Sequence, residues 1–252
     1  MTKSGSEIAK AGYDTESLVV LKFINWNTDN DVITWLEKMG YNLKEIQSVY
    51  AQKLHGQKTD VQIQVSIKLK TVIDVQNIQV KLVTTNECGG FNQVDKRWVD
   101  SYKNMWNIPD SVVQTLKYYV GENPPPISNV RDKRRMFLSE MNNDSVIELV
   151  NWLSQNLVMI VNDVLRGRGR FTVEWLLVLH QTNQTERWFF ESINPIMNYY
   201  SNGGVNITAN GNLKIGKISI QRKGGDAGAK TAQMLQFKID PLEYFKNNLT
   251  IC

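Results

Sequence analysis

Asp60, Gln79 and Lys81 have the residue types and the spacing that metal-assisted hydrolysis of a phosphodiester would need. Eighteen residues separate Asp60 from Gln79, and Val80 and Lys81 follow directly. A hard cation prefers oxygen ligands, which the Asp60 carboxylate, the Gln79 amide and the Val80 carbonyl would provide. The cation would neutralise a phosphate and lower the pKa of its bound water, while Lys81 would stabilise developing negative charge. The set is therefore a candidate site for a hard cation.

Two predicted strands would bring these side chains together. From residue 61 to 69 the apolar side chains fall on alternate positions, which is typical of a half-buried strand. In a second predicted strand, from residue 74 to 84, Val80 lies on one face and Gln79 and Lys81 on the other. If the strands are neighbours, Asp60 lies beside that polar face. On spacing alone, however, a solvated strand face explains such a pattern more often than a catalytic site does.

The remaining elements suggest a mixed protein. The first fifty residues are predicted to be helical, with Asp29 or Asp31 capping a second helix. Further helices are predicted over 95–106, 109–119, 144–165 and 194–200. Strands are predicted over 171–181, 188–191, 205–208, 213–222 and 231–239, separated by turns that are often rich in glycine. Three consecutive prolines at 124–126 are interpreted as a surface crossing within one domain.

Composition restricts the class of protein. Of 252 residues, 42% are hydrophobic and 21% are charged, which is ordinary for a globular chain. No apolar run is long enough to span a membrane and no signal peptide is recognisable, so a cytoplasmic protein is expected. The only two cysteines, Cys88 and Cys252, suggest neither a zinc site nor a disulfide. The net charge of +4 says little about a polyanionic partner, but basic residues cluster at 131–135, 166–170 and 214–238.

A family resemblance changes the weight of these observations. The acid followed by Q-x-K on two strands resembles the PD-(D/E)XK nucleases, with glutamine where most members have an acid. The resemblance extends over nearly the whole chain to the type II restriction endonucleases that recognise GCGC and cut after its first G. It rests on residues 9–10, 77–83, 90–93, 132–137, 165–169, 221–226 and 234–241.

The resemblance implies the catalytic residues and the cofactor. It assigns catalysis to Asp60, Gln79 and Lys81, and metal binding to Asp60, Gln79 and Val80, with Mg²⁺ as the cofactor and Mn²⁺ able to substitute. Glutamine in place of an acid removes one negative ligand and should weaken metal affinity. Glu16 occupies the place of an extra acid near the metal in many such nucleases, although a first-turn acid favoured by the helix dipole explains it as well.

The basic segments then become candidates for binding double-stranded DNA. Arginine or lysine can contact guanine O6 and N7, and a carboxylate can accept from cytosine N4. Phe91 would wedge between base steps from the minor groove, with packing in the core as the alternative. The loop at 221–226 would read bases, although without the resemblance a basic hairpin turn explains it equally well. The predicted DNA-binding residues are Phe91, Asn92, Gln93, Arg166, Arg168, Gln221, Arg222, Lys223, Gly224, Asp226 and Lys238.

We therefore expect an α/β fold with a mixed central β-sheet flanked by α-helices. A single endonuclease domain over residues 1–252 is predicted, with a catalytic core at about 1–100 and 171–191 and a DNA-reading elaboration at about 201–240. The expected function is Mg²⁺-dependent cleavage of double-stranded DNA at GCGC, with a cognate cytosine methyltransferase as functional partner. Alternatives are a related site such as CCGC or GCNGC, a nicking repair nuclease, and a DNA-binding protein with a decayed nuclease site. Monomer and homodimer both remain open.

Overall fold

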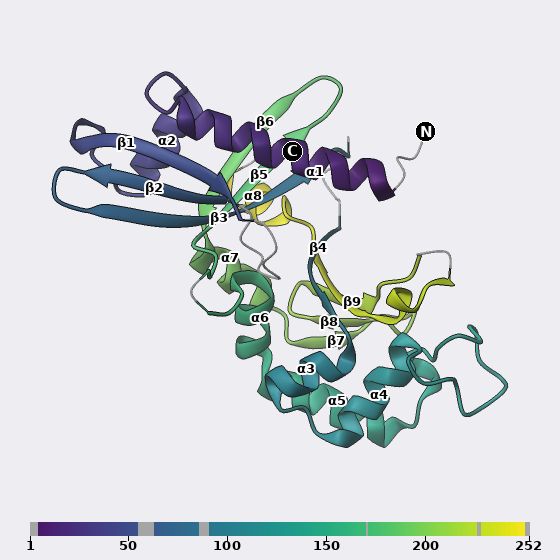
Figure 1. Ribbon diagram of the computed structural model, residues 1–252. Coiled ribbons are helices and arrows are strands. Elements are labelled where there is room, and N and C mark those ends of the chain that lie inside the picture. Colours follow the sequence, from purple (N-terminus) through teal and green to yellow (C-terminus); the bar gives the residue numbers. More distant parts are fainter. Residues whose placement is uncertain (1–4, 55–62, 86–90, 170, 226–227, 250–252) are drawn as a thin grey trace. The chain divides into compact units, whose positions relative to one another are not determined.

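The computed structural model of the protein describes residues 5–54, 63–85, 91–169, 171–225 and 228–249 (Figure 1). Four residues named above lie outside these ranges, namely Asp60, Cys88, Asp226 and Cys252. The chain divides into two compact units. Unit 1 comprises residues 1–90, 166–196 and 240–252, and unit 2 comprises residues 91–165 and 197–239. A single endonuclease domain stays a prediction beside this division.

Unit 1 contains a mixed five-stranded sheet. Its strands lie in the order β1 (Ile46–Lys53), β2 (Ile63–Leu69), β3 (Ile73–Val83), β5 (Trp175–Gln181) and β6 (Glu186–Ser192). The β3–β5 pair is parallel, and the other pairs are antiparallel. The predicted pairing of the strands near residues 61–69 and 74–84 is confirmed, with Ile63 opposite Ile78.

Helices α1 (Gly5–Ile24) and α2 (Asn30–Lys38) supply the apolar layer of unit 1 (Figure 1). Their buried side chains, Val19, Phe23, Val32, Trp35 and Leu36, share one core with Ile63, Val65, Ile78 and Val80 of the sheet. Asp29 caps α2 as predicted, because its carboxylate accepts from the backbone N–H groups of Asp31 and Val32. One face of the mixed sheet is therefore closed by helices.

Unit 2 contains an antiparallel five-stranded sheet. Its strands lie in the order β4 (Asn92–Arg97), β10 (Leu235–Ile239), β9 (Ile218–Arg222), β8 (Leu213–Ile215) and β7 (Val205–Ile207).

The helices beyond α2 are α3 (Val99–Trp106), α4 (Asp110–Val120), α5 (Asn143–Gln155), α6 (Leu157–Arg166), α7 (Ile193–Ser201) and α8 (Glu243–Leu249). Short 3₁₀ turns cover Leu43–Glu45, Leu138–Glu140 and Lys230–Gln233.

Aromatic side chains pack α3 and α4 against one face of the antiparallel sheet. Tyr102 stacks on Trp106 with ring centroids 4.6 Å apart, and Phe237 of β10 meets both rings edge-on. The Tyr119 hydroxyl donates to the Ile220 carbonyl over 2.8 Å. Side chains that alternate with these along β9 and β10 are more polar, so the opposite face of the sheet is the polar one.

The strand predicted over 213–222 is two strands, β8 and β9, and the one predicted over 231–239 begins only at Leu235. Three helix predictions are also wrong in part. The first fifty residues are not all helical, because β1 begins at Ile46. Residues 95–106 are not one helix, because 92–97 pair with β10 as β4 before α3 begins. The helix predicted over 144–165 is two helices, because Asn156 leaves helical geometry and its side chain bonds to the Trp152 carbonyl over 2.8 Å.

The fold class is confirmed, since the chain is α/β with a mixed sheet flanked by helices. Within the described ranges, no helix combines the length and the apolar character that crossing a bilayer requires.

Candidate functional site

Strand β3 presents two chemically different faces. Ile78 and Val80 point into the core of unit 1, where α1 and α2 cover them. Gln79 and Lys81 lie on the opposite face, beside Leu176 and Val178 of the parallel neighbour β5. An amide and an ammonium group are therefore two residues apart on one face, against apolar neighbours.

The Gln79 side chain is buried although it is polar. It is 1% exposed, and its Nε2 atom has no hydrogen-bond partner among the described residues. An unsatisfied buried amide costs about 1–3 kcal/mol, so such a position is kept where a ligand compensates. Rotating the Gln79 amide by half a turn would present its oxygen at the same point.

An oxygen presented by Gln79 fits a hard cation, and so does the adjacent Val80 carbonyl. The acid predicted to complete the site, Asp60, lies outside the described residues. Within the described part of the chain, no group of three or more His, Cys, Asp or Glu side chains is placed to hold a metal. A metal centre on β3 would thus depend on neutral oxygen donors together with Asp60.

A chain of amides positions the polar face of the mixed sheet. Gln52 of β1 donates to Gln64 of β2, and Gln64 donates to Asn77 of β3, each over 3.2 Å. Asn77 in turn donates to the Thr172 carbonyl over 3.1 Å, and its backbone N–H donates to Glu174 over 2.9 Å. Sequence reasoning missed these partners, although alternating glutamines in β2 were the available signal. The chain fixes the register of β3 directly before Gln79.

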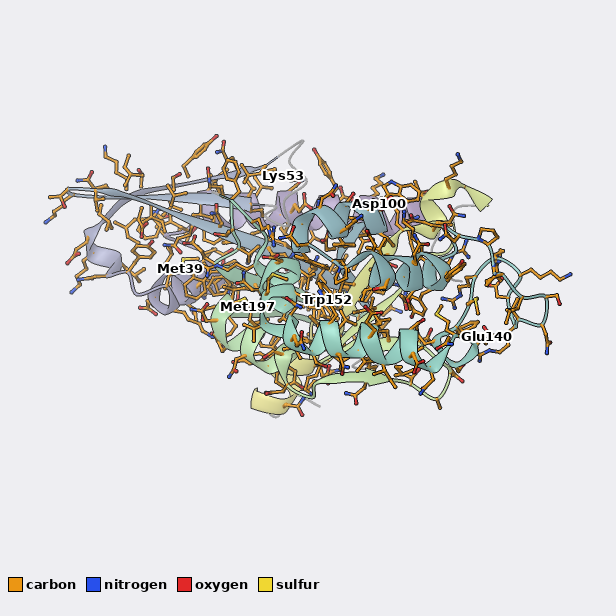
Figure 2. All side chains as sticks on the ribbon, turned by 90° about the horizontal axis from the view of Figure 1, so that it is seen from below. Met39, Lys53, Asp100, Glu140, Trp152 and Met197 are labelled. Carbon is orange, nitrogen blue, oxygen red and sulfur yellow. The ribbon has the colours of Figure 1, made fainter. Side chains whose placement is uncertain are left out.

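Glu16 lies on α1, the helix that covers the other face of β3. Its carboxylate is 3.8 Å from the ammonium group of Lys53. Lys53 is the last residue of β1 and is labelled in Figure 2. Lys53 also donates to the Tyr13 carbonyl over 2.6 Å and lies over the Tyr13 ring. This pairing gives Glu16 a structural partner, and its part in catalysis stays a prediction.

Phe91 does not pack in the core. Its side chain is 61% exposed, directly before β4 in unit 2. The alternative of core packing is therefore wrong, and an apolar ring is available at the surface. The next residues, Asn92 and Gln93, begin β4, and Gln93 accepts from Gln236 of β10 over 2.7 Å.

Lys238 lies on the polar face of the antiparallel sheet. It is opposite Gln93 of β4 and Ser219 of β9, and Ser219 is opposite Lys214 of β8. Burial lowers the pKa of the Lys238 ammonium. A half-buried cation on a polar sheet face can receive an anion, which agrees with the prediction that Lys238 contacts DNA.

The predicted base-reading loop begins at the end of β9. Gln221 and Arg222 still belong to the strand, and Lys223 continues its pairing by donating to the Met234 carbonyl. Gly224 and Gly225 then adopt positive φ angles of 68° and 65°, which glycine tolerates best. A side chain at Gly224 or Gly225 would meet no atom within 4 Å, so the backbone there is open to close approach.

Arg166 and Arg168 stand at the end of α6, in unit 1. Arg166 is the last helical residue, and its Nε is buried with no hydrogen-bond partner in the part of the chain that is described. Gly167 and Gly169 have positive φ angles that end the helix, as their spacing predicted. Contact of these arginines with DNA stays a prediction.

The chain matches one protein-family model. That model is described as the R.HinP1I restriction endonuclease, and the match covers residues 39–245. The matched range includes β3, the polar sheet face of unit 2 and the loop after β9. No curated protein matches the sequence significantly.

Proposed function

Since the chain belongs to the R.HinP1I restriction endonuclease family and is a type II site-specific deoxyribonuclease, we propose that it cleaves double-stranded DNA at GCGC with Mg²⁺. The family match covers most of the sequence. The observation that supports a retained active site is the polar face of β3, where Gln79 is buried and Lys81 follows two residues later. No described residue bonds to the Gln79 Nε2 atom.

Asp60, Gln79 and the Val80 carbonyl would hold the metal. A bound Mg²⁺ ion lowers the pKa of a bound water and neutralises charge on the phosphate. Lys81 would orient the attacking water by donating a hydrogen bond to it from the ammonium group, and would stabilise the negative charge that develops on the phosphate. The apolar side chains Leu176 and Val178 beside Lys81 keep water from screening that charge. Mn²⁺, with similar ligand preferences, is proposed as a substitute.

Recognition of GCGC requires contacts to guanine and cytosine edges. Lys223 and Asp226, in the loop after β9, supply the cation and the carboxylate that these two bases select. Phe91 is proposed as the apolar wedge, because its ring is exposed and glycines precede it in the sequence. Asn92, Gln93 and Lys238 line the polar region next to it on β4 and β10. Activity on duplex DNA is expected in the cytoplasm.

Digestion of a plasmid of known sequence tests the proposal. The protein is incubated with Mg²⁺, and the ends of the fragments are sequenced. Ends at every GCGC and nowhere else are expected. Ends at CCGC or GCNGC would replace the proposed site with a related one. Single-strand nicks alone would indicate a nicking repair nuclease.

Binding without cutting would indicate a sequence-specific DNA-binding protein with a decayed nuclease site. This alternative is considered because glutamine occupies position 79, where most such nucleases have an acid. A gel-shift assay on a GCGC duplex in Ca²⁺, run beside the digestion, separates this outcome from a failure to bind.

A cognate cytosine methyltransferase is proposed as the functional partner. Methylation of the inner cytosine of GCGC should then block cleavage, and equal digestion of methylated and unmethylated plasmid would contradict this. Because the site is two-fold symmetric, a homodimer would cut both strands in one encounter, whereas a monomer would release a nicked intermediate. The amount of nicked plasmid during digestion distinguishes the two.

A further inference from the structure

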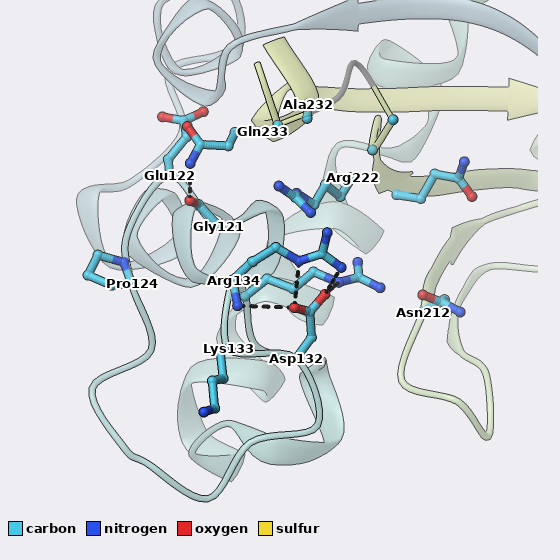
Figure 3. Close-up of a pocket in the computed structure, with 15 residues that line it drawn as sticks. Gly121, Glu122, Pro124, Asp132, Lys133, Arg134, Asn212, Arg222, Ala232 and Gln233 are labelled. Atoms are coloured by element: carbon cyan, nitrogen blue, oxygen red, sulfur yellow. Dashed lines mark hydrogen bonds and ion pairs between the residues drawn. The ribbon is translucent and has the colours of Figure 1, made fainter. Parts of the chain in front are cut away.

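A cavity of about 720 Å³ in unit 2 gathers arginines from distant parts of the sequence (Figure 3). The segment after α4 supplies Lys133, Arg134 and Arg135, and the end of β9 supplies Arg222. The acidic residues among the described lining side chains are Asp132 and Glu122. Basic groups therefore outnumber acidic groups in the described lining.

Asp132 is already occupied by neighbouring arginines. Its carboxylate accepts from Arg134 Nε over 2.9 Å, from an Arg134 terminal nitrogen over 3.0 Å and from the Arg134 backbone N–H over 3.0 Å. Arg135 Nε lies 3.9 Å from the same carboxylate. Figure 3 shows Arg134 and Asp132 joined in this way on the side of the cavity opposite Gln233. The interaction holds the Arg134 guanidinium in place without neutralising its neighbours.

Arg222 approaches from the other wall of the cavity. Its Nε is buried with no hydrogen-bond partner among the described residues. Burial, and then repulsion from Arg134 and Arg135, lowers the pKa of the Arg222 guanidinium, against an opposing attraction from Asp132. A buried, charged donor without an acceptor is costly, so this arrangement is stabilised by a ligand that brings negative charge.

Arg135 is fixed by aromatic rings. Its guanidinium lies 4.1 Å from the Phe137 ring centroid and 5.8 Å from that of Tyr119. Because the rings contact the face of the guanidinium group, the N–H groups at its edge can still donate hydrogen bonds. Such an edge binds planar or tetrahedral oxyanions. The guanidinium groups of Arg134 and Arg135 are thus held before any ligand arrives.

We propose that Arg134, Arg135 and Arg222 form a binding site for a phosphate of the DNA backbone, and that Arg222 therefore sets the position of the duplex rather than reading a guanine. A guanine edge is neutral and would leave the positive charge of the three guanidinium groups uncompensated, whereas a phosphodiester brings one negative charge and two non-bridging oxygens that accept hydrogen bonds from guanidinium groups. The positive-φ glycines after Arg222 leave open space for the sugar–phosphate chain. The inference rests on the proposed cleavage of DNA and deepens it.

The salt dependence of binding tests the proposal. Arg134→Gln and Arg222→Gln proteins are titrated with a GCGC duplex and with an unrelated duplex in Ca²⁺ at several salt concentrations. Each substitution should weaken binding of both duplexes by the same factor and reduce the salt slope by about 1. Arg187→Gln, which removes an exposed arginine of unit 1, should leave the slope unchanged. Thermal unfolding confirms that each variant is folded, and Arg222→Lys should keep the slope because it keeps the charge.

Two results would overturn the proposal. If Arg222→Gln weakens GCGC binding but not unrelated DNA, at an unchanged salt slope, Arg222 reads a base. If neither slope nor affinity changes, the arginines serve the fold alone. A slope that falls in a protein that never cuts DNA would support the phosphate site while refuting the proposed cleavage, so the two failures are distinguishable.

A duplex scanned with single methylphosphonates, each of which removes one backbone charge, identifies the phosphate. One position should weaken wild-type binding and leave Arg134→Gln unaffected. If no position behaves in this way, while inorganic phosphate raises the melting temperature of the wild type and not of Arg134→Gln, the cavity takes a free anion and the assignment to DNA is wrong.

Discussion

The polar face of β3 in unit 1 and the arginine cavity of unit 2 share one property. Each contains a buried polar nitrogen that has no hydrogen-bond partner within the described ranges, Gln79 Nε2 in the first and Arg222 Nε in the second. They differ in charge. Gln79 is a neutral amide that can turn its oxygen to a cation, while Arg222 is a guanidinium among others of the same sign.

The difference shows how one polyanion can be bound in two ways. The reacting phosphate is proposed to be bound through a metal ion. A neutral ligand at Gln79, in place of an acid, should bind that metal ion less tightly. A phosphate that only fixes position needs direct charge, which guanidinium groups supply without a metal. The unsatisfied atom of each region is the observation on which the ion proposed for it rests.

The largest effect is expected at Lys81. Lys81→Ala should lower the rate of cleavage by about a thousandfold, because it removes the group that stabilises charge on the reacting phosphate. Binding to a GCGC duplex in Ca²⁺ should change little. Single-turnover cleavage and gel shift measure the two quantities, with Lys68→Ala on the neighbouring strand β2 as control. Asp60→Ala should behave in the same way, and either variant cutting at the wild-type rate would show that the catalytic assignment is wrong.

Substitutions of Gln79 test whether this residue binds the metal ion. Gln79→Glu adds a negative oxygen and should lower the Mg²⁺ concentration for half-maximal cleavage by about tenfold, since charged ligands tighten hard-cation binding. Gln79→Leu should raise that concentration or abolish cleavage. Cleavage rates measured over a Mg²⁺ series test this. An unchanged Mg²⁺ dependence in both variants would separate Gln79 from the metal.

Substitution of Lys238 should change stability and DNA binding in opposite directions. Lys238→Met should weaken DNA binding by about tenfold, the usual worth of a hydrogen bond to a charged group. It should also raise the melting temperature at neutral pH. Burial lowers the pKa of Lys238 in the folded state, so the protonated form destabilises the fold below that pKa, and the penalty disappears as the pH rises toward the unfolded value.

The gain in melting temperature of Lys238→Met should therefore shrink at alkaline pH. Differential scanning calorimetry between pH 7 and pH 10 measures it. A lower melting temperature at pH 7 would mean that Lys238 has a stabilising partner, and DNA binding equal to that of the wild type would remove it from the interface.

The smallest effect is expected at Glu122 in the cavity. Burial raises the pKa of its carboxyl group, and its oxygen accepts from the Val99 N–H over 3.0 Å. The wild type therefore loses stability as the pH rises through that pKa, whereas Glu122→Gln keeps the acceptor without the charge. The variant should melt about 1–3 °C higher at pH 7, with no difference at pH 3. An identical melting temperature at both pH values would contradict the buried carboxylate.

The sequence predicted the site of unit 1 better than that of unit 2. Strict alternation in β2 and β3 placed Gln79 and Lys81 on one face, because a strand period depends on local sequence alone. Strand β1 was missed because its pairing with β2 shifts register between Ile46 and Ser48, which breaks the alternation. Asp60 lies outside the described residues, so its place beside β3 stays a prediction.

The arginine cavity was not predictable from local pattern. The clusters near 131–135 and 221–226 were recognised separately, and their convergence depends on the tertiary packing that brings the segment after α4 to the end of β9. Local sequence likewise did not show that β4 would pair with β10, because the pattern at 95–106 also suits a helix. The periodicity of the sequence did not predict the function, which was predicted from the family resemblance.

Strand β3 has neighbours from distant parts of the chain. It pairs with β2 immediately before it and with β5 far beyond it, after most of unit 2 has intervened in the sequence. Pairing across such a separation is slow, because the entropy of the intervening loop is lost before the contact is made. A newly synthesised chain therefore completes the mixed sheet of unit 1 only after β5 and β6, which end at Ser192, have emerged.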